Sequence, residues 1–183
     1  MRRLTLAVAL ACAAAGPAAA AGRDAAAIVA DLGGGQLAPA AAVPELAALP
    51  VATLAAQLAR PRTSTVEQRR AVLRAIKASV PDASGKFETP KRQKADQIRA
   101  DEAFDWLAEL TALAADVPGK AEVIADVTLL RALAASPDRA AATVIIDVGF
   151  AADTMIYRDE CGRQLRAMAP ASVPALTIAS QAP

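Results

Sequence analysis

The sequence predicts an all-α fold without a β-sheet. Of its 183 residues 55% are hydrophobic but only 3% are aromatic, and alanine makes up much of the hydrophobic share. Alanine has the highest helix propensity and a weak preference for strands, so this composition favours closely packed helices. Prolines also divide the chain into segments in which apolar residues recur at helical spacing.

The N-terminus has the layout of a secretory signal peptide. A basic start, Arg2-Arg3, precedes an apolar run and then small residues that end at Ala21. The apolar run is shorter than the ~20 residues that a membrane-spanning helix needs. We therefore expect residues 1–21 to be cleaved and the protein to be periplasmic or secreted. The alternative is a lipoprotein modified at Cys12, against which Ala9 stands where a large aliphatic residue is usual.

The first part of the exported chain divides in two. Residues 22–43 are low in complexity, and the Gly33-Gly34-Gly35 run breaks any helix there. We expect them to form a weakly ordered leader that contributes little to the core. A helical domain is predicted over 44–183, and its first clear helix over 51–59, after Pro50.

The next predicted helix starts at Ser64-Thr65-Val66-Glu67. These residues have the form of a capping box, in which the Ser hydroxyl and the Glu carboxylate satisfy each other's free backbone amides. Pro81 ends this helix, because proline lacks an N–H group and clashes with the preceding turn. Residues 81–90 have the composition of a loop.

A long helix is predicted over 91–115. Four carboxylates lie outside its apolar arc: Asp101, Glu102, Asp105 and Glu109. We interpret them as a solvated face rather than a divalent-ion site, because no ligand-rich loop accompanies them.

The C-terminal part is predicted to form further helices separated by turns. Residues 121–135 are apolar on most of the helix circumference, so we place them at the centre of the fold. Ser136-Pro137 is typical of an N-cap followed by the first helical position. The run 143–148 is rich in β-branched residues and is open to a buried strand, but we predict a helix because a lone strand would have no partner. Helices over 153–168 and from Ser172 follow.

Several kinds of catalytic site are absent from this chain. It contains no histidine, which removes the commonest general base and every His-containing metal site. After signal cleavage Cys161 is the single cysteine. It lies on the apolar stripe of its helix, and its neighbours Asp159 and Glu160 disfavour a thiolate. We predict that the protein is not an enzyme and uses no cofactor or metal; an enzyme built on Cys161 and these two carboxylates is the alternative.

Two segments are related by a constant offset. Residues 69–81 align with 158–170, so that Arg69 meets Arg158 and Val72 meets Cys161. The second segment and its continuation resemble HEAT repeats, in which an Arg, a small residue and an aliphatic residue precede a proline-containing corner. The matching residues are Arg158, Cys161, Leu165, Met168, Pro170, Val173, Pro174 and Leu176, while Asp153 stands one position short of the Asp found in many repeats.

The resemblance implies a short α-solenoid of antiparallel helical hairpins. Such a fold buries a continuous core and exposes a long curved surface, which implies binding rather than catalysis. It supplies no functional residues, because the recurring positions are structural. The apolar residues 176–179 are not the polar cap that a terminal repeat needs, so we expect either further repeats beyond Pro183 or a partner that covers this end.

Charge is segregated along the chain. Residues 60–99 contain eleven Lys/Arg and four Asp/Glu, a net of +7, and residues 100–160 contain four and twelve, a net of −8. We predict an exported scaffold for protein–protein contacts, with no nucleic acid or small-molecule substrate as partner. The candidate partner-binding residues are Arg69, Arg70, Arg74, Lys77, Lys91, Arg92 and Lys94. The alternatives are a peripheral binder of an anionic envelope surface or polymer, and charges that are merely solvated.

Overall fold

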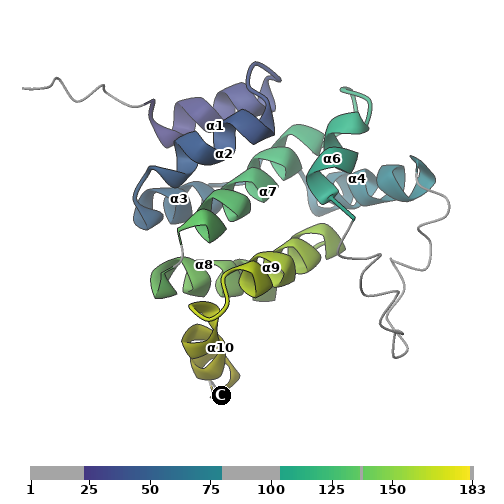
Figure 1. The fold of residues 1–183 in the computed structure, drawn as a ribbon. Helices are drawn as coiled ribbons and strands as arrows, with labels where there is room; N and C mark the ends of the chain where they lie inside the picture. Colours follow the sequence, from purple (N-terminus) through teal and green to yellow (C-terminus); the bar gives the residue numbers. More distant parts are fainter. Residues whose placement is uncertain (1–22, 80–103, 137, 182–183) are drawn as a thin grey trace, which may run out of the picture.

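The computed structural model describes residues 23–79, 104–136 and 138–181 (Figure 1). Within these ranges the chain is helical and contains no strand, as the composition predicts. In chain order the helices are α1 (Ala25–Gly33), α2 (Pro39–Ala47), α3 (Val51–Leu58), α4 (Val66–Ser79), α6 (Trp106–Ala112), α7 (Lys120–Ala135), α8 (Arg139–Phe150), α9 (Met155–Ala167) and α10 (Ser172–Gln181). In the described part of the chain no helix is both long and apolar enough to cross a membrane.

Helix α7 lies at the centre of the fold, as its apolar sequence predicts. From Val123 to Leu133 every residue except Arg131 is buried. Helices α1, α2, α3, α6, α8 and α9 all pack against it, so elements from both ends of the chain meet on one helix (Figure 1). In a solenoid each hairpin contacts only its neighbours. The all-α class is confirmed, whereas a linear stack of hairpins is not.

The core consists of two clusters that α7 joins. The Trp106 cluster combines the N-terminal half of α7 with apolar residues of α4, α6 and α9. The Leu130 cluster combines the C-terminal half of α7 with α1, α2, α3, α8, α9 and α10. Because α7 contributes to both, neither cluster is complete without it.

Residues 23–43 do not form the leader that the sequence analysis predicted. They build α1 and the first half of α2, and both helices pack on α7. Asp24 caps α1 by accepting a hydrogen bond from the Ala27 amide (2.6 Å), and Ile28 and Leu32 are buried in the Leu130 cluster. The prediction was wrong because alanine-rich composition was taken for weak order, whereas small side chains allow helices to pack closely.

The glycine run and the prolines end or begin helices here rather than preventing them. Gly33 is the last residue of α1, and Gly35 takes the turn with φ of 70°. Pro39 occupies the first position of α2, where a missing amide costs nothing. Ala42 and Leu46 of α2 are fully buried.

The capping box at α4 lies one residue later than predicted. Thr65 Oγ1 accepts from the Gln68 amide (3.2 Å), and Gln68 Oε1 accepts from the Thr65 amide (2.8 Å). Ser64 is instead bonded to Glu122 of α7. Thr-x-x-Gln and Ser-x-x-Glu both fit the motif, and the tertiary contact of Ser64 selects the first.

The helix predicted over 91–115 is shorter in its described part, where α6 covers only Trp106–Ala112. The first part of this predicted helix, the predicted loop 81–90 and the predicted helix end at Pro81 lie outside the described residues. Asp105 has extended backbone angles (φ −110°, ψ 104°) and accepts hydrogen bonds from the Leu107 and Ala108 amides, so α6 begins at Trp106. In the sequence, apolar residues continue at helical spacing past Asp105, so the pattern did not reveal this helix start.

The boundaries around α8 also differ from prediction. Ser136 is the C-cap of α7, and the N-cap of α8 is Asp138, which accepts from the Ala141 amide (2.7 Å). Pro137 itself lies outside the described residues. The β-branched run 143–148 is helical, as predicted, and belongs to α8. The buried face of α8 consists of Ala141, Ala142, Ile145 and Ile146.

Candidate functional site

The described members of the predicted basic face differ in their exposure. Arg70 and Arg74 of α4 are exposed and lie 2.9 and 3.8 Å from the Glu67 carboxylate, which partly neutralises them. Lys77 is exposed near the end of the same helix. Arg69 is buried, so its place in the predicted face was wrong. Three further members, Lys91, Arg92 and Lys94, lie outside the described residues.

Arg69 is a structural residue. Its Nε donates to Asp153 Oδ2 (2.9 Å), and its Nη1 donates to Ser64 Oγ (3.0 Å) and to the Ser64 carbonyl oxygen. The hydrogen bond to Asp153 raises the pKa of the guanidinium above its ordinary value, so the group stays charged. Arg69 therefore ties the start of α4 to the loop before α9.

A second charged group, the Asp126 network, lies where the chain between α3 and α4 crosses α7. Asp126 is 1% exposed; Arg60 Nη2 lies 2.8 Å from Oδ1, and the Tyr157 hydroxyl donates to Oδ2 (3.0 Å). Burial raises the pKa of Tyr157, and the nearby Asp126 carboxylate adds to the rise, so the hydroxyl keeps the proton that it donates. Arg62 is held more loosely, with Nε 3.5 Å from Asp126 and its guanidinium 5.0 Å from the centre of the Tyr157 ring.

The carboxylates around α6 and α9 are used in ion pairs. Arg131 of α7 donates to Glu160 (2.7 Å) and to Asp105 (2.5 Å), and the Trp106 indole donates to Asp159 (2.5 Å). Burial lowers the pKa of Arg131, but these hydrogen bonds outweigh it and leave the pKa raised. Asp105 thus caps a helix and pairs with arginine rather than facing solvent alone. In the part of the chain that the structure describes, no group of Cys, Asp and Glu is arranged to hold a metal ion.

Cys161 is buried where α9 approaches α8 closely, as its position on the apolar stripe predicts. A Cβ atom added to Gly149 would lie 3.2 Å from the Cys161 Cβ. Burial raises the pKa of the thiol to about 12, and the Glu160 charge contributes to the rise. This environment disfavours the thiolate, which is the nucleophilic form of cysteine.

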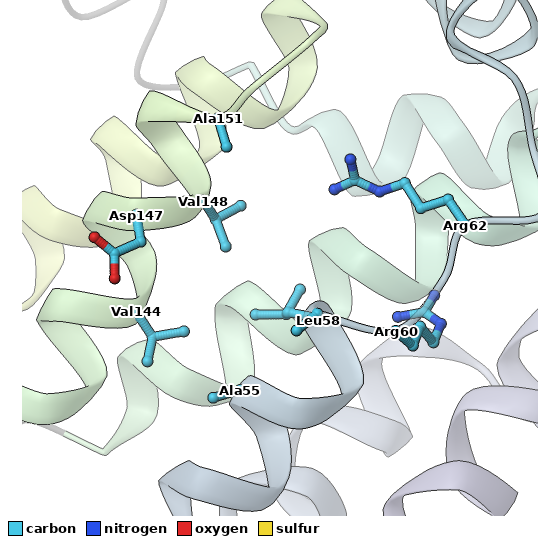
Figure 2. A pocket seen from close by; sticks show the side chains of 9 residues that line it. Ala55, Leu58, Arg60, Arg62, Val144, Asp147, Val148 and Ala151 are labelled. Carbon is cyan, nitrogen blue, oxygen red and sulfur yellow. The ribbon is translucent and has the colours of Figure 1, made fainter.

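Two hollows flank α8 on opposite sides. The α3–α8 pocket has a volume of about 440 Å³ and is bounded by α3, α8 and the arginines Arg60 and Arg62 (Figure 2). The α8–α10 groove has a volume of about 420 Å³ and is lined by apolar residues of α8, α9 and α10 together with Arg158. Sequence reasoning found neither, because the lining residues of each come together only when the helices pack. The only signal was that Arg158, Cys161, Leu165 and Leu176 of the HEAT-like pattern line the groove.

Two large exposed apolar side chains line the α8–α10 groove. Phe150, at the end of α8, is 79% exposed and Leu176 of α10 is 42% exposed, and both line the groove. Val173 and Ile178 of α10 are also more than half exposed, but they are not among the residues that line the groove. Within the described ranges Val66 is the one other large apolar side chain with comparable exposure.

No protein-family model, no curated protein and no solved structure matches this chain. The resemblance to HEAT repeats stays a prediction, and the function has to be argued from the geometry.

Proposed function

We propose that this protein is an exported, non-catalytic helical scaffold that binds a protein partner through the α8–α10 groove. The observation that carries the proposal is that two exposed large apolar side chains, Phe150 and Leu176, line one apolar hollow. Contiguous exposed apolar surface with a polar surround is typical of interaction sites. The signal-peptide layout of residues 1–21 and the HEAT-like pattern of α9 and α10 agree with a binding role outside the cytoplasm.

An amphipathic helix of the partner suits this groove best. Three helices border the hollow, and a fourth can place its apolar face between them, as in other helix-in-groove complexes. Arg158 is the one charged residue among those that line the groove. A carboxylate beside the apolar face of the partner helix would complement it. The basic residues of α4 are less suited to recognition, because Glu67 already pairs with two of them.

Site-specific crosslinking tests the surface directly. A photoreactive amino acid replaces Phe150 in one variant and Val66, exposed on α4, in a control. We expect a crosslinked partner from the Phe150 position alone, identified by mass spectrometry. Crosslinks from Val66 only, or from neither position, would contradict the proposal.

The affinity of the captured partner then distinguishes binding in the groove from non-specific binding to apolar surface. Leu176→Glu and Arg158→Glu should each weaken binding by about tenfold or more, since one removes an apolar contact and the other reverses the complementary charge. Val66→Glu is the matched control and should bind as the wild type does. Circular dichroism of each variant checks the fold, and equal affinity of all four proteins would contradict the proposal.

A further inference from the structure

The α3–α8 pocket has apolar walls and one cationic end. Besides Asp147, its walls consist of aliphatic side chains from α3, α8 and the residues that follow these helices: Ala55, Leu58, Ala59, Val144, Val148 and Ala151. Arg60 and Arg62 close one end. A volume of about 440 Å³ falls within the range of about 300–1,000 Å³ that is usual for small-molecule sites.

Arg62 is the polar group that this pocket offers to a ligand. Two carboxylates lie near it, but stronger partners already bind both: Arg60 and Tyr157 bind Asp126, and Arg69 binds Asp153. Arg62 is left with contacts of 3.5 and 3.9 Å to these carboxylates, and it makes no hydrogen bond to any described residue. Its side chain is 28% exposed. A guanidinium presents five donors, and two of them can bind one carboxylate.

The directions of the side chains exclude a zwitterionic ligand. Figure 2 shows Arg62 extending across the pocket toward Ala151 and Val148, whereas the Asp147 carboxylate points away from it. A ligand amine would therefore find no counter-charge inside. Apart from Asp147, which points away, the walls offer no polar side chain for a peptide backbone, whose buried amides would stay unsatisfied. The ligand that fits is an anion with an unsubstituted alkyl chain.

We propose that the α3–α8 pocket binds a medium-chain fatty acid, with its carboxylate on Arg62 and its alkyl chain between Leu58 and Val148. This site lies on the face of α8 opposite the α8–α10 groove. Its existence does not depend on a protein partner, so either proposal can fail without the other.

Isothermal titration of the purified protein with sodium octanoate tests the proposal. We expect saturable binding of octanoate, weaker binding of octan-1-ol because it lacks the charge, and no detectable binding of acetate because it lacks the chain. Arg62→Gln should weaken octanoate binding by about tenfold, the usual loss for one charge-assisted contact. Arg70→Gln, which alters an exposed arginine of α4, is the matched control and should leave the affinity unchanged.

A second variant keeps the test independent of the Asp126 network, which Arg62→Gln also touches. Ala55→Phe fills the alkyl end of the pocket and leaves both arginines intact, so octanoate binding should again fall. Circular dichroism checks the fold of each variant. Absence of octanoate binding, equal binding of octan-1-ol, or unchanged affinity of Arg62→Gln and Ala55→Phe would each overturn the proposal.

Discussion

Arg69 and Arg158 show how far one residue's surroundings decide its role. A constant offset aligns them in the sequence, and both stand near the start of an amphipathic helix. In the fold Arg69 is 5% exposed and bound to Ser64 and Asp153, whereas Arg158 is exposed at the α8–α10 groove. The aligned positions Val72 and Cys161 are both buried. The two segments share an apolar pattern, but their arginines lie in different surroundings.

This difference predicts unequal effects of the same substitution. Arg69→Ala leaves the Asp153 carboxylate and the Ser64 carbonyl oxygen without their partner, and should lower the free energy of unfolding by about 3 kcal/mol. Arg158→Ala removes an exposed side chain and should change it by no more than about 0.5 kcal/mol. Urea unfolding followed by circular dichroism measures both. Similar losses for the two variants would mean that the arginines are structurally equivalent after all.

At the scale of elements, Glu122 joins α7 to the chain that enters α4. Its carboxylate accepts hydrogen bonds from the Thr63 amide (3.1 Å), the Ser64 amide (2.9 Å) and the Ser64 hydroxyl. Burial acts to raise the pKa of Glu122, but these hydrogen bonds and the charge of Arg60 outweigh it and leave the pKa below its ordinary value. The contact also explains why Ser64 does not cap α4.

The lowered pKa of Glu122 predicts the direction of a pH effect. Between the folded and the unfolded pKa the unfolded chain binds more protons, so stability rises with pH in this window. The contribution of Glu122 is complete above the unfolded pKa and is lost as the pH falls through the folded one. Glu122→Gln should therefore be less stable than the wild type at about pH 7, and the difference should narrow toward about pH 3. Urea unfolding at several pH values measures it, with Glu67→Gln, an exposed carboxylate of α4, as control; a difference that stays constant or widens at acid pH would contradict the expectation.

At the scale of the whole molecule, α7 connects the two core clusters, and we expect it to couple their unfolding. Its buried residues run without interruption from the Trp106 cluster to the Leu130 cluster, apart from Arg131, which pairs with Glu160 and Asp105. Because each cluster needs α7 in place, loss of packing in one cluster should also destabilise the other. We therefore expect the two clusters to unfold together in one cooperative transition. The single tryptophan of the chain, Trp106, lies in one cluster and reports on that cluster alone.

A substitution in the Leu130 cluster tests whether the two clusters unfold together. Leu129 is fully buried in the Leu130 cluster, and Leu129→Ala should lower the stability by about 3 kcal/mol. We expect Trp106 fluorescence and far-ultraviolet circular dichroism to give coincident urea transitions, both shifted equally by this change. Leu176→Ala, at an exposed position, should shift neither by more than about 0.5 kcal/mol. A fluorescence transition that Leu129→Ala does not move would show that the clusters unfold separately.

The helical class and the central position of α7 could be predicted from the sequence because they follow from local properties. Alanine propensity and proline positions fix where helices form, and an apolar circumference requires burial on all sides. The helix over 143–148 was predicted against local β-propensity for a similar reason, since no other segment offered a strand partner. The prediction from composition was wrong at residues 23–43, because a low-complexity sequence there forms α1 and the first half of α2 in the core.

The candidate sites could not be predicted, because their residues meet only in the folded chain. Arg60 and Arg62 belong to a basic stretch of sequence, yet their distances from Asp126 and their place at the end of an apolar pocket depend on how α3 and α8 pack. Arg69 belongs to the same stretch and is removed from the surface by Asp153. Short-range patterns determine which segments are helical and which faces are apolar. Only tertiary packing decides which charges are paired inside and which remain available to a ligand, because ion pairs form between residues far apart in the sequence.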